Sequence, residues 1–327
     1  MSNYSPPFEI TSKITELLVK IGGELVRLEG TTGGSLAPHL RRGNRIKTIQ
    51  ASLAIEQNTL TIEQVTAVIE GKPVIGLPRE IREVKNAFAV YEGLEQFAPC
   101  SSSDLLNAHR LLMADLVESA GKWRTGGVGV VKGKEVVHMA PPAANVPSLM
   151  DDLLTWLQQT DTHPLITSCV FHYELEFIHP FADGNGRMGR LWQSVILTHW
   201  NPVFNWIPVE TIIRDRQQEY YTILATCDKA GSSTLFIEFM LHAILESCGG
   251  VNGGVSGGVK SLEVQILSLL NSSPKALRAN QIALKVNSPQ RSVERALQRL
   301  KQDNRIAFAG APKTGGYVPV HESNHIW

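Results

Sequence analysis

The feature that most constrains this chain is the stretch HPFADGNGRMGR, which runs from His179 to Arg190. Gly184 and Gly186 flank Asn185, and glycine allows the positive φ values that turn successive backbone N–H groups toward one point. The residues that follow have an apolar spacing typical of a helix, so we expect this turn at a helix N-terminus. The helix dipole favours an anion there. The stretch is therefore predicted to hold a polyphosphate.

The charged side chains of the same stretch fit this interpretation. Arg187 and Arg190 are three residues apart, so on the first turn of a helix they share a face and can both bind phosphate oxygens. Asp183 offers a hard oxygen ligand for a Mg²⁺ ion that bridges phosphates. His179 has the only side chain in the stretch with a reference pKa near neutrality, about 6.5, and is the natural general base.

Each of these residues also has an ordinary structural interpretation. A histidine after an apolar helix is more often a capping residue, a Gly-Asn-Gly sequence is a common turn, and two arginines at this spacing usually form a solvated face. Packing does not require a base, a carboxylate, an anion-binding turn and an arginine pair within one short stretch. We therefore favour the functional interpretation for the group as a whole.

At every fixed position the stretch resembles the H-x-F-x-[D/E]-G-N-G-R-x-x-R signature of the Fic (Fic/Doc) family. This signature is long and specific. The resemblance implies a helical fold that binds ATP and Mg²⁺ and usually transfers AMP to a hydroxyl side chain of a protein.

The resemblance also implies a role for each matching residue. His179 would deprotonate the target hydroxyl, Phe181 would be a buried anchor, and Asp183 would hold Mg²⁺. The other matching residues would bind phosphates, with an anion hole and two cations: Gly184, Asn185, Gly186, Arg187 and Arg190.

A second segment, SLAIEQN from Ser52 to Asn58, is expected to form a short helix that leads into a turn. Taken alone, Glu56 is an ordinary solvated helix charge. Beside the Fic signature, S-x-x-x-E-x-N resembles the family's inhibitory helix, whose glutamate pairs with the second motif arginine, here Arg190. Its place upstream matches the class with an N-terminal inhibitory helix. Gln57 stands where the pattern more often has Gly or Asn, which leaves the strength of inhibition open.

Two β-rich runs, VGVV and EVVHMA, predict a hairpin with a turn at Lys132-Gly133-Lys134. A hairpin that only decorates the surface is the ordinary interpretation. In Fic proteins the equivalent segment is a flap that pairs with an extended target segment, so β-augmentation is the better hypothesis. Pairing would present the acceptor hydroxyl to His179, and the flap residues would be Val128, Gly129, Val130 and Val131.

Composition bounds the remaining possibilities. The chain has 327 residues, of which 43% are hydrophobic and 19% charged, as in ordinary soluble proteins. Its formal net charge is zero, so no global field indicates nucleic acid or membrane. No signal peptide or membrane-length apolar run is recognised. Widely spaced cysteines without a C-x-x-C pair predict reduced thiols and a cytoplasmic location; they are Cys100, Cys169, Cys227 and Cys248.

The C-terminal part differs in pattern. The glycine-rich sequence GGVNGGVSGGV, residues 249–259, is predicted to be a linker. Beyond it, helices followed by a two-stranded ribbon resemble a winged helix, a domain often found after Fic cores. Residues 260–327 contain ten Lys or Arg and four Asp or Glu, a net charge of +6. The basic residues Arg291, Arg295 and Arg299 lie at i, i+4 and i+8 of one helix. This spacing and the positive net charge favour DNA as the partner, with a protein partner as a near-equal alternative.

The sequence therefore predicts a mainly α fold: a Fic-type helical core with a β-hairpin flap, plus a small C-terminal winged-helix domain. We expect an N-terminal helical extension with the inhibitory helix at 1–100, the core at 101–248, the linker at 249–259 and the winged helix at 260–327. Within this frame, residues 210–227 are predicted to form one helix, and Ser102 or Ser103 is predicted to cap the helix over 103–117.

The predicted function is transfer of AMP from Mg²⁺-ATP to a Ser, Thr or Tyr hydroxyl of a target protein or of the chain itself, inhibited by Glu56. Two alternatives are kept. The site could instead remove AMP from a modified protein, with Glu56 orienting water. The chain could also be a nucleotide-sensing DNA-binding regulator, although a sensor would not need His179. A homodimer is left open, and no membrane partner is expected.

Overall fold

The computed structural model describes residues 4–32, 38–132 and 135–250, and in the C-terminal part residues 262, 266–267, 269–270, 273, 276–286, 288–302, 305–310 and 315–319. The chain forms two compact units, residues 1–257 and 258–327. Over the described residues it is mainly helical with two small antiparallel sheets, so the predicted fold class is confirmed, while the winged helix remains a prediction.

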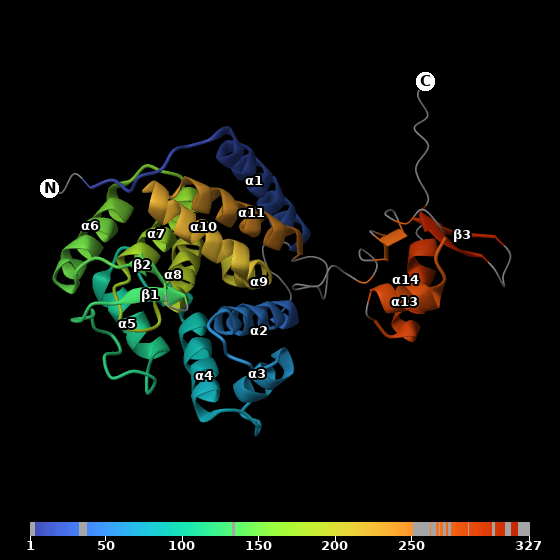
Figure 1. Cartoon of the computed structure of the whole chain (residues 1–327), viewed down its shortest axis with the longest axis horizontal. Helices are drawn as coiled ribbons and strands as arrows, with labels where there is room; N and C mark the ends of the chain where they lie inside the picture. The colour runs from blue at the N-terminus through green and yellow to red at the C-terminus, as the bar shows by residue number, and fades with distance from the viewer. Residues whose placement is uncertain are drawn as a thin grey trace. The chain divides into compact units, whose positions relative to one another are not determined.

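Four helices make up the N-terminal part of the first unit (Figure 1): α1 (Ser12–Thr32), α2 (Pro38–Ile55), α3 (Ile62–Ile69) and α4 (Pro78–Glu92). α1 buries an apolar stripe at helical spacing, which includes Ile14, Ile21 and Leu28, against α11. α3 starts with the predicted capping box, in which Thr61 and Gln64 exchange side-chain and backbone hydrogen bonds.

The rest of the first unit is a helical bundle with one hairpin. Its helices are α5 (Ser102–Leu112), α6 (Val146–Gln159), α7 (Pro164–Ile178), α8 (Asn185–Trp200), α9 (Val209–Asp215), α10 (Gln217–Ala230) and α11 (Thr234–Gly250). Short 3-10 turns lie at Leu94–Gln96, Ala143–Asn145 and Pro202–Trp206, and the hairpin consists of β1 (Gly129–Lys132) and β2 (Glu135–Met139). Its turn, residues 133–134, lies outside the described residues.

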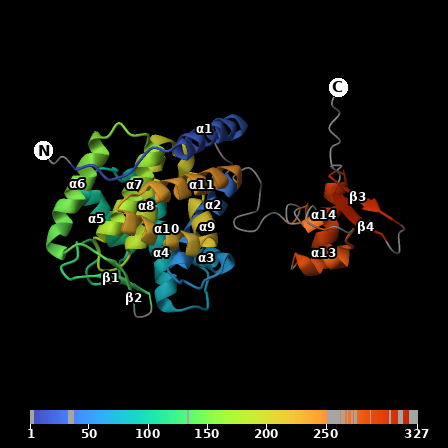
Figure 2. The same ribbon diagram turned by 45° about the horizontal axis from the view of Figure 1, so that its top comes forward.

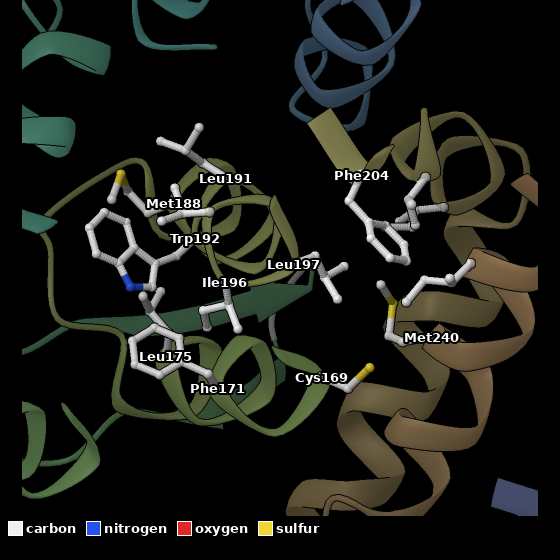
Figure 3. Packing of buried hydrophobic residues seen from close by; sticks show 14 of the residues in the cluster. Cys169, Phe171, Leu175, Met188, Leu191, Trp192, Ile196, Leu197, Phe204 and Met240 are labelled. Carbon is white, nitrogen blue, oxygen red and sulfur yellow. The ribbon is translucent and has the colours of Figure 1, made fainter. Parts of the chain in front are cut away.

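The centre of this unit is the pair α7 and α8, which pack against each other (Figures 1 and 2). Both helices are buried along most of their length. In Figure 3, Phe171 and Leu175 of α7 lie beside Trp192 and Ile196 of α8. Because side chains from both helices fill the core, the C-terminal end of α7 and the N-terminal end of α8 are held in fixed places. The predicted polyphosphate stretch connects these two ends.

Three sequence-based expectations are corrected. The segment that begins at Ser52 is not a separate short helix, because α2 continues through Ile55. α5 begins one residue early, with Ser101 as its N-cap, since the Ser101 hydroxyl accepts the N–H of Asp104. The region 210–227 is two helices, α9 and α10, because the backbone leaves the helical conformation at Arg216.

The second unit has its own small apolar core. Its described elements are α13 (Ala279–Lys285), α14 (Gln290–Gln302), β3 (Ile306–Ala309) and β4 (Gly316–Pro319), and residues 262, 266–267 and 269–270 are also helical. β3 and β4 pair antiparallel, and Leu277 forms a bridge to Tyr317 of β4. α11 runs through Gly250, so the first two residues of the expected linker are helical, and residues 251–259 lie outside the described residues.

Among the described residues, no helix combines the length and the apolar character that crossing a bilayer requires.

Candidate active site

The motif turn, which we define as residues 179–190, is organised around one buried asparagine. α7 ends at Ile178, and α8 begins at Asn185 after Gly184 in the left-handed conformation, with φ 87°. The Asn185 side chain accepts the N–H of Phe181 and donates to its carbonyl, both at 2.9 Å. Phe181 is fully buried. The Asn185 side chain therefore shapes the turn, and the first turn of α8 is the part that can face an anion.

The expectation of a positive φ at Gly186 is wrong, because this residue lies inside α8. The need for glycine there has another cause. A Cβ atom at Gly186 would lie 2.5 Å from Oε1 of Glu56 and 3.2 Å from Nη1 of Arg190. Gly186 therefore lets a carboxylate approach the N-terminal turn of α8 closely. An anion already lies where the sequence predicts that phosphate binds.

His179 caps α7 in the left-handed conformation, with φ 52° and ψ 60°, which is unfavourable for a residue with a side chain. Its Nδ1 lies 3.2 Å from the carbonyl oxygen of Glu176. Since a carbonyl can only accept, Nδ1 carries the proton and the lone pair is on Nε2. In the neutral ring, Nε2 is therefore the nitrogen that can act as a base.

Arg190 has a side chain that is only 1% exposed, and it contacts the end of α2. Its Nε donates to the Ser52 hydroxyl at 3.1 Å, and its Nη2 donates to the Ser52 carbonyl at 3.1 Å and to Oε1 of Glu56 at 2.8 Å. Burial alone would lower the pKa of Arg190, but the Glu56 carboxylate, together with Tyr220 and Glu176, outweighs this and holds the pKa above its ordinary value. The structure thus brings together the glutamate and the arginine that the sequence pairs.

We call residues 52–58 the closing segment. Within this segment the chain leaves α2 through a Schellman motif. The N–H of Asn58 bonds the carbonyl of Leu53, and the N–H of Gln57 bonds that of Ala54. Such an ending requires a left-handed residue, and Gln57 has φ 68°. Glycine or asparagine suits this position best, which gives a physical reason for the preference from which Gln57 departs.

Asn58 does not contact Arg190 but connects the closing segment to the other motif arginine. Its Nδ2 donates to Oε2 of Glu83 on α4 at 2.8 Å. The other oxygen of Glu83 lies 3.3 Å from Nη1 of Arg187. Arg187 also pairs with Asp183 at 3.1 Å, and Arg79 pairs with the same aspartate at 3.3 Å. Each motif arginine therefore has a carboxylate partner from the N-terminal extension.

Sequence reasoning missed two buried residues that support the motif turn. The ring of His109 stacks on Phe181, with ring centroids 3.7 Å apart. Its Nδ1 accepts the N–H of Gly121, so Nε2 is protonated and donates to the Asp183 carbonyl at 3.0 Å. Burial lowers the pKa of His109 to about 4. The second residue, Arg124, donates to the carbonyl oxygen of His179 at 2.7 Å. Neither stands near the motif in sequence, so no local pattern points to them.

The donor set around Asp183 fits Mg²⁺ only with help from the substrate. Among the described residues there is no cluster of three or more His, Cys, Asp or Glu that could hold a metal ion. The Asp183 side chain is 41% exposed and is the single motif carboxylate. One or two carboxylates completed by substrate phosphates and water is a common Mg²⁺ arrangement, so a nucleotide would supply the missing ligands.

The hairpin has the predicted strands with one irregularity. Val128 precedes β1, which contains Gly129, Val130 and Val131. β1 pairs antiparallel with β2, and the register shifts between Val130 and Val131. A hairpin of two strands leaves outer edges, and such an edge can accept an added strand.

Comparisons with known proteins agree with this geometry. The sequence profile of the Fic/DOC family matches residues 99–197. The crystal structure of a Fic family protein from Desulfovibrio desulfuricans G20 is 46% identical, covers 98% of this chain and all of its own, and superposes with a TM-score of 0.74. This chain belongs to the Fic/DOC family. The predicted resemblance is therefore confirmed.

Curated relatives of this Fic protein include "Protein adenylyltransferase fic-1" of Caenorhabditis briggsae, 35% identical over 190 residues, and "Protein adenylyltransferase Fic" of Nematostella vectensis, 28% identical over 244 residues. These matches cover 53% and 69% of this chain. The chain spans only 34% and 53% of the length of these two relatives.

Proposed function

We propose that this Fic protein is a protein adenylyltransferase, which transfers AMP from ATP to a hydroxyl group of a protein. The observation that carries the proposal is the motif turn, where a histidine with its lone pair on Nε2 and two arginines meet at a helix N-terminus. The names of the curated relatives support the same activity. The preferred acceptor is a Ser, Thr or Tyr hydroxyl, of a target or of the chain itself.

In the proposed reaction Nε2 of His179 takes the proton of the acceptor hydroxyl as its oxygen attacks the α-phosphorus. The new oxygen–phosphorus bond forms as the bond to pyrophosphate breaks, and the pyrophosphate keeps the electron pair of that bond. Arg187, Arg190 and the N–H groups at the start of α8 would stabilise its negative charge. Asp183 would hold Mg²⁺, which would neutralise phosphate charge when bound.

The closing segment supports an inhibited ground state. Glu56 binds Nη2 of Arg190, and its carboxylate lies against Gly186. It therefore occupies both the cation that the phosphates would bind and the place where they would lie. Ser52 holds the same guanidinium, and Asn58 ties the segment to α4. Productive binding of ATP then requires the carboxylate to move away.

The hairpin and the cysteines support two further parts of the proposal. The outer edge of β1 would bind an extended stretch of the target, which would bring its hydroxyl to His179. All four cysteines carry free thiols, and three of them are buried. Free thiols favour a reducing compartment, so we place the protein in the cytoplasm.

The position of the radioactive label tests the reaction class. We expect label from α-labelled ATP to become attached to protein and label from γ-labelled ATP to stay in solution, because AMP retains only the α-phosphate. Lysate of the protein's own host supplies candidate acceptors. Transfer of the γ label would show phosphoryl transfer instead and would overturn the proposal.

Removal of AMP is the second candidate for the same site. Glu56 is 32% exposed and lies beside the start of α8, where it could orient a water molecule. Under this alternative Glu56→Gly would abolish release of AMP from a labelled protein. Under the preferred proposal the same variant would increase attachment.

A separate proposal concerns a partner of the second unit. Two helices, a two-stranded ribbon and a bridge from Leu277 to the ribbon support the winged-helix interpretation. Arg291, Arg295 and Arg299 are exposed on α14, and residues 260–327 carry a net charge of +6. We infer that α14 binds duplex DNA, so that the enzyme would also act as a DNA-bound regulator.

Charge reversal on the full-length chain tests this partner. We expect the Arg291→Glu/Arg295→Glu variant to lose binding to duplex DNA at low salt, where counterion release makes such binding strongest. Lys85→Glu/Lys229→Glu makes the same charge change at exposed positions of the first unit and should keep it. Equal binding by the parent and both variants, or none by the parent, would favour a protein partner.

A further inference from the structure

Arg124 joins two parts of the site that are far apart in sequence. Its side chain is buried, with 4% of the residue exposed. The guanidinium donates to the carbonyl oxygens of His179 at 2.7 Å and Ile178 at 3.3 Å. It also donates to those of Gly126 at 2.9 Å and Pro141 at 2.5 Å. One buried cation thus binds backbone from two separate elements.

The first element is the end of α7. The last carbonyl groups of a helix lack partners in the helix and form the negative end of its dipole, so a cation is favourable there. Besides the two side-chain contacts, the N–H of Arg124 donates to the carbonyl of Pro180 at 2.9 Å. Arg124 therefore binds three consecutive carbonyls across the left-handed backbone of His179. A conformation of this kind persists only when its surroundings determine it.

The second element is the hairpin. Gly126 lies three residues before β1 begins, and Pro141 lies two residues after β2 ends. Arg124 thus binds the chain at both ends of the hairpin, at the points where the strands leave the helical bundle. Residues on either side of β1 and β2 are tied to the same guanidinium that binds His179.

We propose that Arg124 is a positioning residue that sets the base and the flap in one geometry, by fixing the backbone of His179 and both ends of the hairpin. The inference rests on the proposed function, in which His179 is the base and the hairpin receives the acceptor strand. Arg124 touches neither the nucleotide nor the acceptor in this account. It determines where the acceptor oxygen lies relative to Nε2 of His179.

Lysine cannot replace this arginine. The planar guanidinium presents N–H groups from three nitrogens, and here Nε, Nη1 and Nη2 all donate. The ammonium group of lysine donates from a single point, so it cannot span the end of α7 and both ends of the hairpin. Arg124→Lys keeps the charge and loses the geometry.

The test compares Arg124→Lys with Arg45→Lys, both in the Glu56→Gly background. Arg45 is matched in burial, also 4% exposed, but it binds Asn205. For Arg124→Lys we expect AMP transfer to protein and hydrolysis of ATP to AMP both to fall roughly 10–100-fold, because small misplacements of reacting groups have such effects. The dissociation constant for ATP should change less than about twofold, because the phosphate-binding groups stay in place. Arg45→Lys should change neither rate by more than about twofold.

Hydrogen exchange provides a readout that does not need activity. The amides of Arg124 and His179, which bond Pro180 and Leu175, should exchange faster in Arg124→Lys than in Arg45→Lys. Unchanged exchange would overturn the positioning role. Loss of protein transfer with normal ATP hydrolysis would overturn the effect on His179, since hydrolysis needs no flap. If the Glu56→Gly background itself transferred no AMP, the proposed function would fail, and exchange would still decide the role of Arg124.

Discussion

The motif turn and the closing segment are both charged and both meet at Arg190, but they are held in different ways. The motif turn is fixed through its backbone by three buried side chains: His109, Arg124 and Asn185. The closing segment is held by side-chain contacts of Glu56 and Asn58, and Gln217 of α10 adds one bond to its backbone, at the carbonyl of Ile55, 2.8 Å away. It also contains the unfavourable backbone of Gln57. This difference supports the proposal of a permanent catalytic part, the motif turn, and a removable cover, the closing segment.

The Arg190–Glu56 ion pair shows the same asymmetry. The arginine side chain is 1% exposed, whereas the glutamate side chain is 32% exposed. A buried charge without a partner is costly, so Arg190 needs an anion at all times. Glu56 supplies one in the closed site, and a phosphate would supply one in the open site. Exchange of one anion for the other is the central idea of the account.

The largest effect should come from removing the general base of the permanent part, His179. We expect His179→Ala to lower AMP transfer by roughly 10²–10⁴-fold, because a positioned general base contributes about this much. Affinity for ATP should stay close to that of the parent. His199→Ala is the matched control, because its Nδ1 also lies 3.2 Å from a backbone carbonyl, at the other end of α8. Transfer at the parental rate by His179→Ala would exclude this residue as the base.

Removal of the cover's carboxylate should have the next largest effect. Glu56→Gly leaves Arg190 without its anion, so we expect ATP to bind roughly tenfold more tightly, which corresponds to about 1.4 kcal/mol. Calorimetric titration measures this. Glu92→Gly is the control, because it removes a carboxylate 3.5 Å from Arg45, whose side chain is also buried. An unchanged dissociation constant for Glu56→Gly would mean that the ion pair does not compete with the nucleotide.

A smaller effect is expected when the closing segment is made more stable instead of weaker. Gln57→Gly relieves a left-handed backbone that costs roughly 1 kcal/mol with a side chain, partly offset by the greater freedom of glycine when unfolded. The cover should become more stable, so AMP transfer should slow by about two- to fivefold as Tm rises. Asp115, with φ 60°, is another left-handed residue and lies outside both segments. Asp115→Gly should raise Tm without slowing transfer; faster transfer in Gln57→Gly would contradict the strained-cover explanation.

The smallest effect on activity is expected in α7 away from His179, where the predicted change is in stability instead. Burial raises the pKa of Glu174 to about 7, although the hydrogen bond from the Tyr4 hydroxyl opposes this. The folded protein therefore holds this proton more firmly than the unfolded chain. Its contribution to stability is present below the ordinary value of 4.5 and is lost as pH rises to about 7.

Glu174→Gln should remove that pH dependence, so its free energy of unfolding should fall less steeply between these values, by up to about 1.4 kcal/mol per pH unit. Tyr4→Phe should raise the pKa of Glu174 further, because it removes the opposing hydrogen bond. Denaturant unfolding at several pH values measures both. Parallel curves for the parent and Glu174→Gln would contradict the assignment.

The local parts of this molecule could be predicted from sequence, and the long-range supports could not. The motif turn lies in one short stretch, so its residue types and spacing predict an anion-binding helix start. The pairing of Glu56 with Arg190, 134 residues apart, was predicted only through the family resemblance. The hydrogen bonds of Arg124 and His109 go to backbone carbonyl and N–H groups, which nearly every residue has. Such contacts leave no trace in the residue types of their partners.

Two smaller misses have the same physical origin. Gly186 looks like a flexible turn residue in sequence, but its lack of a side chain makes room for Glu56, which lies in the turn after α2. The break between α9 and α10 at Arg216 has no glycine or proline to mark it. Tertiary packing determines the residue type in the first case and the backbone conformation in the second. The local sequence pattern does not contain this packing.

Attachment of AMP by three forms of the chain tests the central claim most directly. The parent, Glu56→Gly and Glu56→Gly/His179→Ala are incubated with α-labelled ATP and host lysate, and protein-bound label is followed over time. We predict that Glu56→Gly attaches AMP about tenfold faster than the parent or more, and that the double variant attaches almost none. Equal rates for the parent and Glu56→Gly, or persistent labelling by the double variant, would contradict an adenylyltransferase site that Glu56 closes and His179 operates.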